Sequence, residues 1–247
     1  MSKKNQQLRA ERAERAAAAL REQELRERRR RTLMVGGVVA ALVLIVVAGF
    51  LINRARDTSG DVNADPPGVG EHGLAIGDAD APHTIVVYED FLCPVCGQFE
   101  ASTNEDLEQL AEDGKAYVEY RPFELLGRFG DYSKRSAAAF AVVMEKSGPE
   151  VAKEFHDLLF ANQPPEEGPF PDDDELVALA VDAGAAEADV ADDIKGGAGE
   201  DWVDAATEAA LDAGVNGTPT VLLDGKVFQE GRTWEEFAEE LVAAASE

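Results

Sequence analysis

Cysteine and histidine are scarce in this sequence, and their scarcity narrows the kinds of site that it can form. The 247 residues include two cysteines, Cys93 and Cys96, and three histidines, His72, His83 and His156. A structural zinc site takes four Cys or His ligands at regular spacing, and these histidines are scattered without it. A disulfide between the two cysteines would close so small a loop that it would restrain the unfolded chain little. The sequence therefore predicts no metal site, and it argues against a purely structural role for the cysteine pair.

Basic residues are scarce beyond the first 56 residues. Residues 57–247 contain 10 Lys and Arg against 44 Asp and Glu, a net charge of -34, whereas residues 1–56 carry +8 and the whole chain -26. So acidic a body repels phosphate groups, which argues against nucleic acid as a partner. We interpret the acidic surplus as a solvated surface.

A long apolar run occurs near the start of the chain. Residues 32–52 contain no charged side chain, and 21 residues at about 1.5 Å each match a hydrocarbon core of roughly 30 Å. A basic arm, residues 1–31, precedes the run and ends in four arginines. This order predicts a single-pass membrane anchor with a cytoplasmic N-terminus. The residues after the run would then lie outside the cytoplasmic membrane.

The alternative for this run is a cleavable signal peptide. Such a peptide has a shorter apolar region, about 7–15 residues, followed by small residues at the cleavage site. Here the run is longer and Asn53-Arg54-Ala55-Arg56 follows it, so a retained anchor is favoured. Residues 53–73 are rich in Gly, Pro and Asp, which predicts a flexible linker between the anchor and a folded domain at 74–247.

The folded domain begins with a pattern typical of an α/β protein. Residues 75–82 form a turn-rich lead-in, residues 83–88 an apolar buried strand, and residues 116–121 a second strand that Pro122 ends. The segment between these strands predicts a helix that opens at Cys93-Pro94-Val95-Cys96 and closes at Asp113-Gly114.

The rest of the domain is predicted to be a helical block followed by a hairpin and a last helix. Residues 131–213 carry helical patterns interrupted by a Pro- and Gly-rich loop at 161–174. Asp224-Gly225 between two apolar runs is a strong hairpin signal, and residues 233–245 have an amphipathic helical pattern. These elements predict a four-stranded α/β core with an inserted helical subdomain.

The cysteine pair is placed for thiol chemistry. Cys96 follows Cys93 by three positions, so in the first turn of a helix the two side chains share one face. A thiol at a helix N-terminus meets free backbone N–H groups and the positive end of the helix dipole, which favour the thiolate. Pro94 suits the first helical position. We therefore expect Cys93 to be an exposed attacking thiolate and Cys96 a more buried resolving thiol, with a mixed disulfide as intermediate.

These residues carry a resemblance to a known family. Tyr88-Glu89-Asp90-Phe91-Leu92-Cys93-Pro94-Val95-Cys96 together with Gly217-Thr218-Pro219-Thr220 resembles the DsbA-like thioredoxin-fold proteins, most of all their membrane-anchored bacterial members. The resemblance spans residues 74–245 and implies an extracytoplasmic thiol–disulfide oxidoreductase with a thioredoxin-like fold. It further implies that Cys93 is the nucleophile, Cys96 the resolving thiol, Pro219 a cis-proline facing the disulfide, and Thr218 a residue whose backbone binds a substrate strand. Without the cysteines, Thr218-Pro219 would be interpreted as an ordinary trans turn.

The sequence departs from this family at one position. Thioredoxin relatives often have a buried acid six residues before the first cysteine, and here that residue is Val87. Glu89 and Asp90 lie nearby, but their sequence positions give them no clear part in proton transfer to Cys96. They are left out of the predicted catalytic set, as residues that shape the turn or raise a thiol pKa by like charge.

Several expectations about partners follow from the resemblance. Exported proteins with thiols or disulfides are the expected substrates, and a membrane or soluble redox partner would recycle the pair. No organic cofactor is needed because the two sulfurs hold the electrons, and a monomer is expected. An apolar surface made by Phe91, Leu92, Phe99 and the insertion could receive unfolded substrates, although core packing is the default expectation for Phe99. The alternatives are a reductase or isomerase for a dedicated client, and a tethered chaperone or metal-binding module without catalysis.

Overall fold

The computed structural model describes residues 62–65 and 72–246 of the chain. The predicted basic arm (1–31), the predicted membrane-spanning segment (32–52) and most of the predicted linker (53–73) lie outside these residues and stay predictions. Among the helices that are described, none combines the length and the apolarity needed to cross a membrane.

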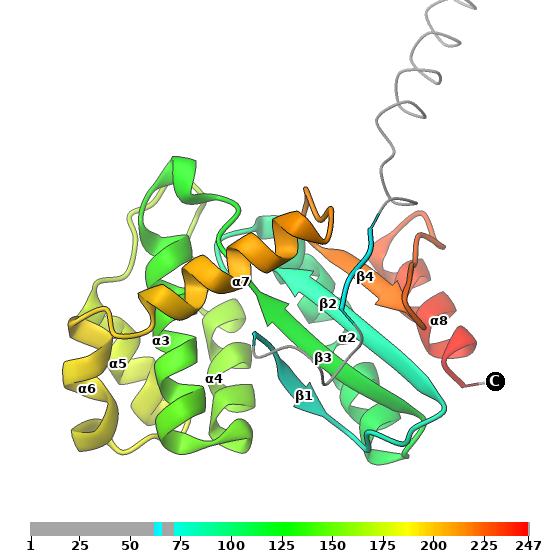
Figure 1. Ribbon diagram of the computed structural model, residues 1–247, viewed down its shortest axis with the longest axis horizontal. Helices are drawn as coiled ribbons and strands as arrows, with labels where there is room; N and C mark the ends of the chain where they lie inside the picture. Colours follow the sequence, from blue (N-terminus) through cyan, green and yellow to red (C-terminus); the bar gives the residue numbers. More distant parts are fainter. Residues whose placement is uncertain (1–61, 66–71, 247) are drawn as a thin grey trace, which may run out of the picture. The chain divides into compact units, whose positions relative to one another are not determined.

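The centre of the domain is a five-stranded sheet in the order β1-β3-β2-β4-β5 (Figure 1). Its strands are β1 (Leu74–Ile76), β2 (His83–Glu89), β3 (Ala116–Pro122), β4 (Thr220–Leu223) and β5 (Lys226–Val227). β2 and β3 are parallel, and the other neighbouring pairs are antiparallel. β2 lies in the middle of the sheet, and its last five residues are buried. Its carboxyl end therefore leads the chain into the cysteine motif from the interior of the domain.

The edge strand β1 corrects the prediction of a four-stranded sheet. The sequence predicted an irregular lead-in at residues 75–82, but Leu74 pairs with Tyr120 and Ile76 with Val118 along β3. Three residues are too few to show the alternation that identifies a strand in a sequence. The strand exists because β3 presents free backbone groups at that edge, which is a property of the assembled sheet.

Helices cover both faces of the sheet. Their bounds are α2 (Pro94–Glu112), η2 (Gly127–Phe129), α3 (Tyr132–Ser147), α4 (Pro149–Ala161), α5 (Asp173–Asp182), α6 (Glu187–Lys195), α7 (Glu200–Asp212) and α8 (Trp234–Ala244). α2 and α8 pack on one face, where Ile85 and Val87 meet Phe99 and Phe237. α7 crosses the opposite face, where Val86 and Tyr88 meet its alanines (Figure 1). Successive residues of β2 thus point to two separate cores, as a strand buried on both faces requires.

The insertion predicted at residues 131–213 contains helices α3 to α7; α3 to α6 lie beside the sheet, whereas α7 crosses one of its faces (Figure 1). The apolar side chains of α3 to α6 belong to one cluster with the cysteine motif, in which Cys93 and Cys96 pack with Phe91, Phe140 and Phe155. The α/β architecture with a helical insertion is therefore confirmed, and the insertion forms one wall of the cysteine site.

The predicted hairpin between β4 and β5 is also present. Asp224 and Gly225 have φ angles of 50° and 76°, the left-handed values that a two-residue hairpin turn needs at both central positions. The Asp224 carboxylate also accepts a hydrogen bond from the Thr84 N–H at 2.9 Å. This contact ties the turn to the start of β2.

Candidate active site

Cys93 lies where the chain enters α2. It is the N-cap residue of the helix, with φ -73° and ψ 113°, and Pro94 occupies the first turn, where a backbone N–H is not needed. No side chain caps this end of the helix. The backbone N–H groups of Val95 and Cys96 nevertheless help to lower the pKa of the Cys93 thiol. A cysteine thus occupies a position that usually holds Ser or Asp, next to the free N–H groups of the first helical turn.

The loop before β4 covers Cys93. Cys93 Sγ lies 3.5 Å from the carbonyl oxygen of Thr218, to which it donates a hydrogen bond while the thiol is protonated. The Thr218–Pro219 peptide bond is cis, as the resemblance implied. Cys93 is 6% exposed and Cys96 is fully buried. Cys96 is more buried than Cys93, as expected. The prediction that Cys93 is exposed is wrong, because the Thr218 segment covers its sulfur.

This loop unites the predicted site residues across the fold. Thr218 lies 125 positions from Cys93, and it arrives at the motif because β4 pairs antiparallel with β2, with Thr220 opposite Tyr88. Pro219 comes with it as the next residue along the chain. The register therefore brings the two motifs to the same end of the sheet, where β2 ends and β4 begins.

The two thiols differ sharply in acidity. The pKa of Cys93 falls from an ordinary 9.0 to about 6, chiefly because the Cys96 thiol donates a hydrogen bond to it. Burial acts in the opposite direction, and Thr218 and the backbone of the first turn of α2 lower the pKa further. Burial raises the pKa of Cys96 well above its usual value, and its hydrogen bond to Cys93 adds to the rise. At pH 7 roughly nine-tenths of Cys93 is thiolate by ordinary titration, whereas Cys96 keeps its proton.

Asp90 shapes the loop between β2 and α2. Its fully buried carboxylate accepts hydrogen bonds from the Leu92 N–H at 2.8 Å and from Ser133 Oγ at 2.7 Å. It also accepts the backbone N–H groups of Leu125 and Leu126, at 2.8 and 2.9 Å. One side chain thus fastens the cysteine loop to the segment that follows β3. Of the two roles considered for Asp90, the structure supports the shaping of the turn.

Glu89 belongs to a buried ionic cluster next to the cysteines. His156 Nε2 lies 2.6 Å from Glu89 Oε1, and His156 Nδ1 lies 2.9 Å from Asp157 Oδ1. Burial disfavours the charged imidazole, but the two carboxylates outweigh it and raise the pKa of His156 to about 10. The negative charge of Glu89 contributes to the raised pKa of Cys96, the like-charge effect considered for this residue.

Glu100 completes the cluster. Its carboxyl oxygens are buried and have no hydrogen-bond partner in the described part of the chain. Burial, followed by the charge of Glu89, raises the pKa of Glu100 to about 8. Ligand atoms of Glu89, Glu100 and His156 lie within 4.8 Å of one another and can in principle hold a cation. Because Glu89 and His156 already share a short hydrogen bond, we interpret the group as an ion pair beside a protonated acid.

Glu100 and His156 were not predicted as site residues, and only Glu100 has a feature in the sequence that could have identified it. Glu100 follows Cys96 by four residues, so it lies on the same face of α2, beside Phe99 and Thr103, which are buried. An acid on the apolar face of a predicted helix is unusual and could have been noticed. His156 had no such signal, because its partner Glu89 is 67 residues away.

The predicted apolar surface around the motif is wrong for Phe91 and Leu92, which are at most 1% exposed and form part of a core. Phe99 is fully buried in another core, which was the default expectation for it. Val95 and Phe129, at 40% and 39%, are among the large apolar side chains that are exposed. Val95 lies between the two cysteines, so the apolar surface at the motif is smaller than expected.

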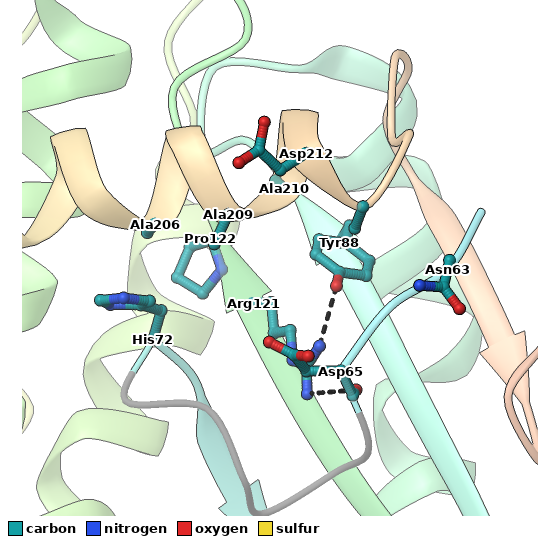
Figure 2. Close-up of a pocket in the computed structure, with 11 residues that line it drawn as sticks. Asn63, Asp65, His72, Tyr88, Arg121, Pro122, Ala206, Ala209, Ala210 and Asp212 are labelled. Atoms are coloured by element: carbon teal, nitrogen blue, oxygen red, sulfur yellow. Dashed lines mark hydrogen bonds between the residues drawn. The ribbon is translucent and has the colours of Figure 1, made fainter.

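A separate pocket of about 360 Å³ lies on the α7 side of the sheet (Figure 2). Arg121 lies in it and donates hydrogen bonds to the Tyr88 hydroxyl at 2.8 Å and to the Asp65 carbonyl at 3.1 Å. The Asn63 N–H donates to the Ala213 carbonyl at 2.8 Å. Residues 62–65 are therefore attached to the face of the sheet that α7 covers. Because the polar groups of Arg121 are used for this attachment, we assign the pocket no ligand.

Comparison with known proteins places this site in a family. The sequence model described as Thioredoxin matches residues 70–242. The reduced form of the disulfide bond oxidoreductase DsbG from Mycobacterium tuberculosis is 29% identical, with a TM-score of 0.61 over 76% of this chain and 90% of that chain. Oxidized DsbA from Mycobacterium tuberculosis is 28% identical, with a TM-score of 0.57 over 70% of this chain and 97% of that chain.

A curated relative is much longer than this chain. The serine/threonine-protein kinase PknE of Mycobacterium tuberculosis is 31% identical over 119 residues, which cover 46% of this chain and 21% of the kinase. The shared region is therefore a small part of that protein.

The chain belongs to the thioredoxin family, and within it the fold is DsbA-like. The family match, the structural neighbours and the paired cysteines at the start of α2 support a protein thiol–disulfide oxidoreductase.

Proposed function

We propose that this protein is a membrane-tethered oxidoreductase that forms disulfides in exported proteins through Cys93 and Cys96. The observation that carries the proposal is the placement of the two thiols: Cys93 caps α2 beside the Thr218 carbonyl, while Cys96 is fully buried. This placement lowers the pKa of Cys93 to about 6 and raises that of Cys96. A stable thiolate at Cys93 makes this sulfur the better leaving group when a mixed disulfide is resolved. Cys96 is shielded from solvent and is suited to act only within the pair.

The reaction proceeds by two thiol–disulfide exchanges. A substrate thiolate attacks Cys93 Sγ of the oxidised protein, the Cys93–Cys96 bond breaks, and Cys96 takes up a proton. A second substrate thiolate then attacks the substrate sulfur of the mixed disulfide and releases Cys93 as a thiolate. The substrate loses two electrons and gains a disulfide, and the protein becomes the dithiol.

The Thr218 segment supplies a place for the substrate backbone. The Thr218 carbonyl lies 3.5 Å from the Cys93 sulfur, so an extended peptide beside it would bring a substrate cysteine to that sulfur. Unpaired backbone groups next to a strand can pair with such a peptide irrespective of its sequence. This suits a protein that acts on many unfolded clients.

The cellular setting is part of the proposal. The uncharged run at 32–52 would anchor the chain, with the N-terminus in the cytoplasm and the catalytic domain outside, where disulfides persist. A membrane or soluble redox partner would reoxidise the cysteine pair. The protein would act as a monomer on exported substrates.

The direction of transfer is tested by the reduction potential of the full-length protein in detergent, equilibrated with glutathione buffers and followed by thiol trapping. Related proteins span about -270 to -120 mV. A value near the upper end supports a disulfide donor. A value near the lower end contradicts it and favours a reductase, whereas an intermediate value with refolding of scrambled clients favours an isomerase.

Replacement of both cysteines by serine tests whether the chain acts as an enzyme at all. We expect exported clients to lose their disulfides in cells that carry the double variant. Unchanged client disulfides together with intact client binding would favour a tethered chaperone.

A further inference from the structure

Gln163 reaches from the insertion to the cysteine motif. It follows Asn162, the C-cap residue of α4, and its Nε2 donates hydrogen bonds to the carbonyl oxygens of Phe91 at 2.9 Å and Cys93 at 3.0 Å. The amide therefore binds two backbone carbonyls on either side of Leu92. Neither contact can be predicted from the sequence, since 70 residues separate Gln163 from Cys93.

The other side of this amide lies against Gly97. A Cβ atom on residue 97 would lie 2.6 Å from Gln163 Oε1. Glycine is disfavoured inside helices relative to alanine, and here it provides the space in which the amide fits. Gly97 and Gln163 therefore form one structural unit on the outer side of the first turn of α2.

The same carbonyl also begins the helix. The Cys93 oxygen accepts the Gly97 N–H at 3.1 Å, the first hydrogen bond of α2. Gln163 thus adds a second donor to a peptide group whose orientation sets the first turn. Cys93 is the N-cap residue of this turn, and the N–H groups of Val95 and Cys96 help to lower the pKa of its thiol.

We propose that Gln163 is a positioning residue for the thiol chemistry: its amide holds the peptide groups around Cys93 so that the first turn of α2 keeps its N–H groups on the nucleophile. The inference rests on the proposed role of Cys93 as the sulfur that forms the mixed disulfide and leaves it as a thiolate. It also gives the helical insertion a part in the reaction, because the end of α4 supplies a group that acts on the cysteine loop.

The first test replaces Gln163 by leucine, which keeps most of the volume and removes both donors. The pKa of Cys93 is measured from the ultraviolet absorbance of the thiolate against pH in the reduced full-length protein. We expect the pKa to rise by about half a unit to one unit, which is about three- to tenfold less thiolate in acidic buffer. Asn162→Ala is the control, since it removes a hydrogen bond to Leu158 at the same end of α4 and should leave the pKa of Cys93 unchanged.

The second test approaches the same contact from the other side. Gly97→Ala should displace the amide, because its Cβ meets the flexible end of Gln163, while alanine favours the helix. We expect a similar rise in the pKa of Cys93 without a loss of melting temperature. The double variant should show no more than either single change, because both break one contact. If Gln163→Leu does not fold, the pKa of Cys93 in Gly97→Ala tests the inference by itself.

The possible results separate the inference from the proposed function. An unchanged pKa in folded Gln163→Leu, an additive double variant, or an equal rise in Asn162→Ala would each overturn the inference. A wild-type Cys93 with an ordinary pKa would instead contradict the proposed role of Cys93. A melting-temperature loss alone, with the pKa unmoved, would show a merely structural role and also overturn the inference.

Discussion

Lowering the pH from 8 to 5 should remove most of the stability that the reduced protein gains from the Cys93 thiolate. The folded-state pKa of this thiol is about 6 against an ordinary 9.0. A depressed pKa means that the folded state binds fewer protons than the unfolded chain, so its contribution is complete above pH 9 and is lost as the pH falls through 6. The window between pH 8 and pH 5 therefore contains most of the change.

The size of the effect follows from the two pKa values. Three pKa units correspond to about 4 kcal/mol at high pH, and the titration curve leaves about 2.7 kcal/mol at pH 8, about 1.4 kcal/mol at pH 7 and almost nothing at pH 5. For a two-electron couple, about 1.4 kcal/mol shifts the reduction potential by about 30 mV. The Cys93 thiolate alone thus makes the pair only moderately more oxidising at neutral pH. The raised pKa of Cys96 does not interfere, because that thiol stays protonated throughout this window.

The assay is urea unfolding of the reduced protein and of Cys93→Ser at several pH values. Other titrating groups are common to the two proteins, so the difference between their free energies of unfolding isolates the thiol at position 93. We expect that difference to favour the wild type increasingly from pH 5 to pH 8. A difference that stays flat across this range would refute the assignment of a stabilised thiolate.

Three further substitutions test the surroundings of the site. Cys96→Ala should raise the pKa of Cys93, because the Cys96 thiol is the largest cause of its depression; an unchanged thiolate absorbance titration would contradict this. Asp90→Ala should lower the free energy of unfolding by roughly 3–5 kcal/mol in urea, because several buried donors lose their acceptor, whereas loss of the exposed Lys195 ion pair should have a much smaller effect. Glu100→Gln should become steadily more stable than the wild type from pH 5 to pH 8: the folded pKa of Glu100 is raised to about 8, so the wild type loses stability as the pH rises through this range. Parallel stability curves for these two proteins would show that Glu100 is not a buried neutral acid.

The features that the sequence predicted well are those fixed by near neighbours. The position of Cys93 at the start of α2 follows from a buried strand, a turn and Pro94, and the β4–β5 turn follows from Asp224-Gly225. Both depend on backbone preferences within a few residues. The insertion could be predicted because helical periodicity extends over many residues.

The sequence by itself determined the thiol pair, its helix and the class of fold, because each is encoded in a local pattern. Only the tertiary structure decided how the thiols behave. Thr218 meets Cys93 through strand register, Glu89 finds its partner His156 in the insertion, and Gln163 binds the cysteine loop from the end of α4. The burial of Cys93 depends on the distant Thr218 segment, whereas the depression of its pKa comes chiefly from the nearby Cys96 thiol, with a smaller contribution from Thr218. Hydrogen bonds and charges act over a few ångströms of space, so their effect on the nucleophile is set by packing and not by sequence order.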